Sequence, residues 1–389
     1  MLHNKLQQSL IAGAVISTLG GLALAPAQAA EPEWDFGGYV KLDAFASDYS
    51  NGMVAGSGNI GRQFYIPSLT PVGGTADDVA TDVHARQSRF FFNVKQELDN
   101  GETISGRIEL DFMTIPTGDE RVTNSYAPRL RQAYFTYGNW LLGQSWSNFQ
   151  ELSILPESVD FIGATDGMVF MRQPQIRYTS GDFSVSLENP ETTVTPFGGG
   201  ARITSSDGVL PDLTVKYKAK SGDFSYALAG IVRQLAHDTD NDGDDETAGA
   251  YGVSLSGKWQ LGSDDIRASV TAGSGLGRYL GLNTFNGAVI QADGSLEAID
   301  SMGLTFAWRH AWSEKARSSL VYSRGWADND TNLVGTGVTE STQRIGVNYM
   351  YSPANNLTFG GEISRATREI ESGVDGDMTR LQFMAMYSF

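Results

Sequence analysis

Apolar and polar residues alternate with a period of two in one segment after another, to the last residue of the 389-residue chain. In 103–113, for example, Ile104 and Ile108 share one side of an extended segment, and Arg107 and Glu109 share the other. This is the period of a β-strand with one apolar and one polar face. A mean hydropathy of −0.23 excludes a bundle of membrane-spanning helices. The chain is therefore predicted to be all-β.

The connections between these segments distinguish a membrane barrel from a soluble sandwich. Seven short turns are predicted, at 99–101, 138–139, 180–182, 221–223, 261–263, 313–315 and 353–355. Eight longer loops alternate with them, near 47–84, 115–128, 147–170, 190–211, 236–248, 276–297, 327–340 and 367–377. Outer-membrane barrels have this asymmetry between periplasmic turns and extracellular loops. The pattern predicts a 16-stranded antiparallel transmembrane β-barrel, with a secreted soluble β-protein as the alternative.

Both ends of the chain carry export and assembly signals. Lys5, an apolar run over 10–24 and an Ala-Gln-Ala cleavage signal at 27–29 predict a signal peptide over residues 1–29, with an N-terminal membrane anchor as the alternative. Residues 30–389 then form a single barrel domain with 27 Lys and Arg, 45 Asp and Glu, and a net charge of −18. The terminal Phe389, with Tyr387 on the same face, predicts a strand that the barrel-assembly machinery recognises.

Charges on the polar face of each strand are expected to line the lumen, because the lipid-facing positions must be apolar. Fourteen are basic: Lys41, Arg89, Lys95, Arg107, Arg129, Arg131, Arg177, Lys216, Lys218, Arg233, Lys258, Arg267, Arg309 and Arg344. Seven are acidic: Asp43, Glu97, Glu109, Asp111, Glu188, Asp212 and Glu362. A wall rich in Arg favours small anions, because guanidinium groups bind carboxylates with two hydrogen bonds. Alternatively, these groups pair with each other and only stiffen the wall.

The third long loop, 147–170, is apolar for an exposed segment and contains no Lys or Arg. Such a loop is expected to bury itself, and folding into the barrel would narrow the channel. Its carboxylates would then face basic residues of the wall across the constriction; they are Glu151, Glu157, Asp160 and Asp166. The alternative is a loop that packs against a neighbouring subunit.

The fifth long loop contains a weak calcium motif. Asp238, Asp240, Asp242 and Gly243 follow the start of a D-x-D-x-D-G loop, but Gly249 stands where such a loop needs a glutamate. A solvated acidic loop, bridged by divalent cations to lipopolysaccharide phosphates, is the preferred interpretation. No metal or other cofactor is therefore predicted.

Several classes of function are disfavoured. A pI of about 4.6 argues against a nucleic-acid partner. The exported chain contains His84, His237 and His310, no Cys, no G-x-S-x-G motif and no zinc motif, so an enzyme is not expected. A passive channel for small anions is favoured. A cation-preferring or weakly selective porin and a barrel that serves as an adhesin remain as alternatives.

Several segments resemble strands of Gram-negative general porins, namely 88–95, 106–112 and 129–135. The Ser-Arg-Phe start at 88–90 and the segment before Arg172-Gln-Pro resemble DcaP-like porins more closely. The resemblance implies a homotrimer of channels in the outer membrane that pass small anionic solutes such as dicarboxylates. It places Arg89 and Arg131 in a basic cluster on the wall, opposite the loop carboxylates. One departure is Gln144, at a position where many porins have Arg.

Overall fold

The computed structural model describes residues 31–389, apart from 55, 57, 58, 76, 77, 116–121, 240–242 and 244. The predicted signal peptide lies outside the described residues. Helix is limited in the described part to one short α-helix, α1 (Thr331–Val334), and to 3-10 turns, which are η1 (Ile60–Arg62), η2 (Pro67–Leu69), η3 (Leu152–Ile154) and η4 (Gly277–Tyr279). No helix among the described residues is long and apolar enough to cross a membrane.

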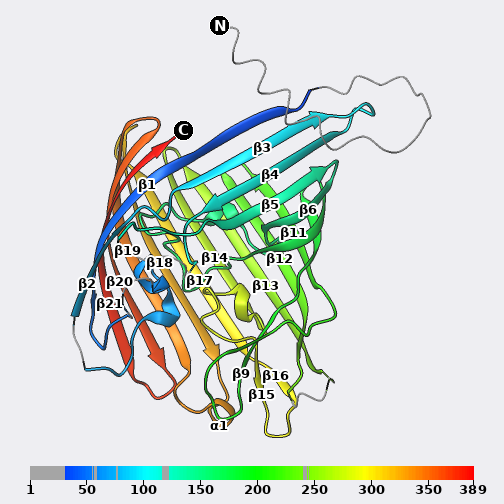
Figure 1. Cartoon of the computed structure of the whole chain (residues 1–389), viewed down its shortest axis with the longest axis vertical. Helices are drawn as coiled ribbons and strands as arrows, with labels where there is room; N and C mark the ends of the chain where they lie inside the picture. The colour runs from blue at the N-terminus through cyan, green and yellow to red at the C-terminus, as the bar shows by residue number, and fades with distance from the viewer. Residues whose placement is uncertain are drawn as a thin grey trace.

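Seventeen strands form one antiparallel sheet that closes on itself (Figure 1). They are β1 (Glu33–Tyr49), β2 (Asp78–His84), β3 (Arg89–Glu97), β4 (Thr103–Asp111), β5 (Arg129–Tyr137), β6 (Trp140–Trp146), β7 (Arg172–Ser180), β8 (Phe183–Glu188), β11 (Asp212–Ser221), β12 (Phe224–His237), β13 (Glu246–Leu261), β14 (Asp264–Ser274), β17 (Asp300–Ala311), β18 (Ala316–Asp328), β19 (Thr339–Ala354), β20 (Leu357–Ile370) and β21 (Asp375–Ser388). Strands β2 and β3 pair with successive parts of the same edge of β1 and share one position. The barrel therefore has 16 strand positions, which confirms the predicted fold class.

The first and last strands close the barrel. Strand β21 pairs with β1 in a continuous register from Tyr39 opposite Ser388 to Tyr49 opposite Met378. Phe389 extends this seam, because its N–H donates to the carbonyl of Gly38 and its own carbonyl accepts from the Gly38 N–H, each at 3.1 Å. Closure leaves no free edge between the first and last strands, as a strand that crosses lipid requires.

The two faces of the strands differ as the alternation predicts. In β13, Val253 and Leu255 are more than half exposed, whereas Ser254 and Ser256 are buried. The apolar face therefore points outward, and the polar face points into the lumen, where other side chains cover it. Ser254, for example, lies 2.8 Å from Thr271 of β14, hydroxyl to hydroxyl.

A second sheet joins two of the long loops. Strands β10 (Ile203–Ser205), β9 (Thr192–Thr195), β15 (Ala288–Ile290) and β16 (Leu296–Ala298) lie side by side in that order, and β9 and β15 are parallel. The sheet links the loop after β8 to the loop after β14 at the end of the barrel that carries the long loops (Figure 1). Strands of three or four residues are too short to show a period in the sequence, so alternation does not reveal them.

The main apolar core is built from loops rather than from the outward faces of the strands. Segments 59–70, 147–170 and 276–285 contact one another; the Phe64 and Phe161 ring centroids are 5.1 Å apart, and Val169 forms a β-bridge with Leu280. Ala307 and Val321, on the inward faces of β17 and β18, belong to the same cluster as Phe64. The core therefore positions the third long loop against the inner side of the wall.

Glycines allow the third loop to approach this wall closely. A Cβ atom at Gly303 of β17 would lie 2.5 Å from the carbonyl oxygen of Gly167, and one at Gly325 of β18 would lie 2.4 Å from that of Asp166. Real Cβ atoms do not come this close to backbone, so side chains at 303 or 325 would displace the loop. These contacts place 166–167 directly on the inner surface of β17 and β18.

Candidate functional site

A cluster of charged residues occupies the inner face of β3, β4 and β5. Glu109 of β4 is its centre: the Glu109 carboxylate lies 2.6 Å from Arg107, 2.6 Å from Arg131 and 3.7 Å from Arg89, measured between the closest nitrogen and oxygen atoms. Arg131 also contacts Asp111 at 2.8 Å and is 1% exposed. The structure thus brings together all five of these sequence-predicted residues.

A β-bulge explains how Arg131 reaches this cluster. Glu109 pairs with Gln132, and the next residue of β4, Leu110, pairs with Leu130, so Arg131 is the extra residue on β5. A bulge re-aims the side chain of the extra residue. Arg131 and Gln132 are consequently both buried on the inner side, although they are adjacent in the chain. Alternation in the sequence predicts Arg129 and Arg131 on the inner face, but it does not predict a second inward residue directly beside Arg131.

Two further arginines extend the cluster towards the long-loop end. Arg129 donates two hydrogen bonds to Asp111, of 2.8 and 2.7 Å. Arg172, the first residue of β7, lies over the ring of Trp146 at 4.6 Å and near Phe170 at 6.0 Å, and it forms no ion pair among the described residues. Among the described residues, Arg89, Arg107, Arg129, Arg131 and Arg172 thus surround two carboxylates, Glu109 and Asp111. We call these seven residues the arginine cluster.

The sequence did not identify Arg172 as a site residue. Alternation along β7 assigns it to the face opposite Arg177. Alternation does not determine the direction of a side chain at the end of a strand, where the chain leaves the sheet. Position 172 directly follows the third loop, and this position in the sequence could have identified it. The end of the loop brings Phe170 and Arg172 close to Arg129.

The carboxylates of the third loop contact basic residues other than Arg89 and Arg131. Glu157 lies between Arg317 and Arg309, at 2.7 and 3.4 Å, and Asp160 lies 3.7 Å from Arg380. Arg317 and Arg380 were not among the sequence-predicted residues. Glu157 is thus in direct contact with the wall and does not face it across an open constriction.

Glu151 and Asp166 have opposite electrostatic environments. Burial favours the neutral acid at Glu151, but Lys216 and Lys218, at 3.6 and 3.1 Å, outweigh it and lower the pKa of Glu151. Burial raises the pKa of Asp166 to about 6, although it accepts a 2.7 Å hydrogen bond from the Tyr65 hydroxyl. Burial therefore destabilises the ionised form of Asp166, which is the form that predominates at neutral pH.

Several other predicted wall residues are also engaged. Arg233 contacts Asp212 at 3.1 Å, and Arg267 contacts Asp265 at 2.6 Å and donates to the carbonyl of Leu155 in the third loop. Arg177 donates to the Gln175 side chain and to the Trp146 carbonyl. The wall is thus heavily paired away from the arginine cluster, as the alternative interpretation proposed.

The calcium motif is only partly described. Asp238 accepts a 3.1 Å hydrogen bond from the N–H of Gly243, whereas Asp240 and Asp242 lie outside the described residues. Within the described part of the chain, no group of three or more His, Asp or Glu could hold a metal ion. A solvated acidic loop stays the preferred interpretation of this motif, and calcium binding stays its alternative.

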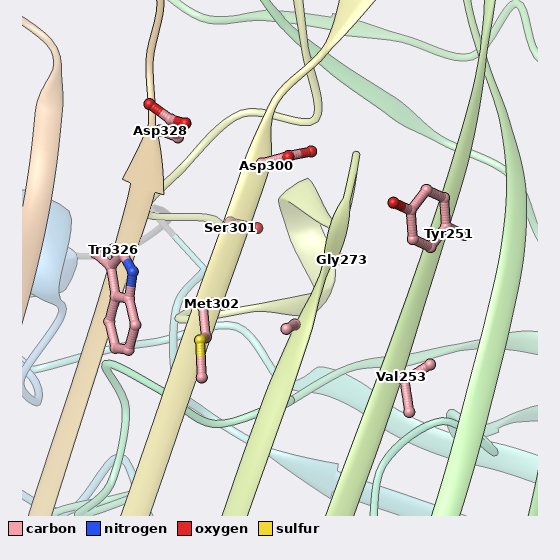
Figure 2. A pocket seen from close by; sticks show the side chains of 9 residues that line it. Tyr251, Val253, Gly273, Asp300, Ser301, Met302, Trp326 and Asp328 are labelled. Carbon is pink, nitrogen blue, oxygen red and sulfur yellow. The ribbon is translucent and has the colours of Figure 1, made fainter.

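A hollow on the outer surface lies apart from this site. Its volume is about 410 Å³, and its lining includes Tyr251, Met302, Trp326 and the carboxylates of Asp300 and Asp328. Figure 2 shows Asp300 and Asp328 at the same end of the hollow, beyond Met302 and Trp326. These side chains belong to the outward faces of β13, β17 and β18, so the hollow faces away from the lumen.

A closed barrel with an apolar exterior and a charged interior defines a channel of the porin type. The model of the family "DcaP outer membrane protein" matches residues 26–389, and the chain belongs to that family. It is a channel of the Gram-negative outer membrane. No curated protein sequence matches the chain.

Solved structures share the fold. The outer membrane channel DcaP of Acinetobacter baumannii is 23% identical, with 95% of this chain and 100% of that chain covered and a TM-score of 0.75. An anion-selective porin from Comamonas acidovorans is 11% identical, with 92% and 100% covered and a TM-score of 0.56. OmpT of Vibrio cholerae is 12% identical, with 93% and 100% covered and a TM-score of 0.55.

Proposed function

We propose that the protein is an anion-preferring channel for passive diffusion of small hydrophilic solutes such as dicarboxylates. The observation that carries this proposal is the imbalance in the arginine cluster, where five guanidiniums surround two carboxylates. Excess positive charge on a wall raises the local concentration of anions and lowers that of cations. Arg89 and Arg107 keep part of their side chains exposed and can therefore meet a solute.

The buried and the exposed arginines of the cluster have different roles. Arg131, which is buried, holds Glu109 and Asp111 in place. The exposed guanidiniums then present free N–H groups in a fork that suits a carboxylate. A second carboxylate on the same solute can engage a neighbouring Arg, which is why dicarboxylates are suitable candidates. Weak, exchangeable contacts of this kind allow a solute to enter and to leave.

The third loop is proposed to form the constriction. Its contacts with Arg317, Arg267 and the glycines of β17 and β18 support a path along the inner wall, opposite the arginine cluster. Because Glu157 is already paired, it contributes little negative field to the open channel. This pairing favours anion preference over the cation-preferring alternative.

We propose a homotrimer, because a solved OmpT of Vibrio cholerae with the same fold is described as a trimer form. The remaining partners are proposed from the location: outer-membrane lipid and lipopolysaccharide on the apolar exterior, and the barrel-assembly machinery at the β21 strand. Residues 1–29 are proposed as the cleaved signal peptide.

The direct test is the zero-current reversal potential of the purified protein in a planar bilayer under a KCl gradient. Chloride preference is expected. Potassium preference would reject the proposal and support a general cation-preferring porin. A folded protein without conductance would support the adhesin alternative.

A further inference from the structure

We propose that the cavity beside Arg172 is a subsite for amphipathic monoanions, solutes with one anionic head and one apolar body. The inference rests on the proposed anion channel and extends its solutes beyond small hydrophilic ones. The structural basis is the combination of one unpaired guanidinium with an apolar cavity built by three loops.

The cavity has the size and lining of a small-molecule site. Its volume is about 480 Å³, within the range of roughly 300–1,000 Å³ that is usual for such sites. The first loop contributes Phe64 and Ile66, the third loop contributes Phe161 and Phe170, and the sixth loop contributes Leu282. Arg129 and Arg172 are its only cationic lining residues in the described part of the chain.

Only one of these two guanidiniums is available to a ligand. Arg129 is engaged by both oxygens of Asp111 and by the Thr114 hydroxyl, at 2.7 to 2.8 Å. Arg172 stacks on Trp146, and its Nη1 atom is buried without a hydrogen-bond partner among the described residues. A buried donor of this kind is costly unless a ligand satisfies it. The cavity therefore provides a place for one negative charge.

The remaining surface selects the body of the ligand. An alkyl chain gains free energy with each methylene that leaves water for the Phe64, Phe161 and Leu282 surfaces. A second anionic group at the far end of that chain would be desolvated against the same apolar side chains, which is unfavourable without a partner. The cavity should therefore prefer a monoanion with a tail to a dianion of the same length.

Alkyl sulfonates are suitable probes, because they stay ionised and cross lipid poorly. The experiment measures block of the chloride current by methanesulfonate, hexanesulfonate and hexane-1,6-disulfonate, with the exported protein reconstituted in a planar bilayer. Hexanesulfonate is expected to block at a concentration at least tenfold lower than methanesulfonate and lower than the disulfonate.

Two variants separate the head from the tail. Arg172→Gln should weaken block by both monosulfonates. Leu282→Asn should reduce the advantage of hexanesulfonate alone; Leu282 has a φ of 55°, a backbone conformation that Asn tolerates, so folding should be retained. Lys315→Gln, in an exposed turn, is the matched control and should change neither value.

The outcomes are distinct from those of the proposed function. Equal block by the two monosulfonates, or stronger block by the disulfonate, would overturn the subsite even if the channel prefers chloride. A channel that prefers potassium, yet is blocked preferentially by hexanesulfonate through Arg172, would reject the proposed selectivity and retain the subsite.

Discussion

The two sides of the lumen carry the same type of residue in different electrostatic states. On β3–β7, four arginines share two carboxylates, and Arg172 contacts no carboxylate in the part of the chain that the structure describes. On β17–β21, three arginines each contact a carboxylate of their own; Arg317 contacts Glu157, Arg344 contacts Glu362 and Arg380 contacts Asp160. The comparison teaches that the field of a channel depends on which charges remain uncompensated. The number of arginines on the wall does not determine it.

The largest effect is expected where the arginine cluster depends on a buried cation. Arg131→Met removes the buried cation that contacts both Glu109 and Asp111 and should lower the free energy of unfolding by about 3–5 kcal/mol, as for other broken buried ion pairs. Denaturant unfolding in detergent measures this change. The control is Arg89→Met, whose side chain is 22% exposed and 3.7 Å from Glu109, and which should cost less than about 1 kcal/mol. Equal losses would show that Arg131 is not the anchor.

Asp166 offers a pH-dependent way to test how the third loop is held. Its pKa of about 6 in the folded protein exceeds that of an unfolded Asp, so stability falls as pH rises from about 4 to 6 and the loss persists above that. Asp166→Asn keeps an acceptor for Tyr65 and should stabilise the loop at pH 7.5 by about 1–3 kcal/mol. Hydrogen exchange of residues 158–170 at pH 7.5 and pH 4 tests this. A gain that persists at pH 4 would contradict the mechanism.

Neutralising the arginine cluster should make its side of the lumen resemble the opposite one. A unit charge about 8 Å from a permeating ion in water changes its energy by about 0.5 kcal/mol, or about twofold in relative permeability. Each removed charge lowers the permeability of chloride about twofold and raises that of potassium about twofold, so the double variant Arg89→Gln/Arg172→Gln should reduce the chloride to potassium permeability ratio about sixteenfold. Reversal potentials at low salt provide the measurement. An unchanged ratio would place the selectivity elsewhere.

Removing a loop carboxylate should have the smallest effect and the opposite sign. Glu157→Gln leaves Arg317 without its carboxylate and Arg309 with Asp265 alone, and it should raise the chloride to potassium permeability ratio up to about fourfold. The same bilayer experiment, repeated at high salt, should show the increase disappear as the charges are screened. A decrease at low salt would mean that Glu157 itself attracts permeating anions through a bound cation.

The barrel architecture could be predicted from the sequence because it depends on local patterns. Alternation along β13 and β4, and turns such as 99–101 and 261–263, follow from residues that are neighbours in the chain. The pairing of Arg107 with Glu109 could also be anticipated, because both lie on one face of β4.

What escaped prediction depends on contacts between distant segments. The partners of Glu157 and Asp160 lie on β17, β18 and β21, and nothing near these acids in the chain specifies them. The bulge at Arg131 and the position of Arg172 violate the alternation on which face assignment relied. Both exceptions occur at the candidate site, where a regular strand could not aim adjacent side chains in the same direction.

The carbonyl of Val159 has a consequence for how the molecule is assembled. It accepts hydrogen bonds from Lys41 of β1, at 2.8 Å, and from Gln382 of β21, at 3.3 Å, so one loop residue contacts both sides of the seam. Its complete docking site exists only after the ends of the sheet have met. In a chain halted before closure, this loop would be accessible to proteases. The time at which cleavage near residue 159 stops would therefore report when the barrel closes, the last step of biogenesis.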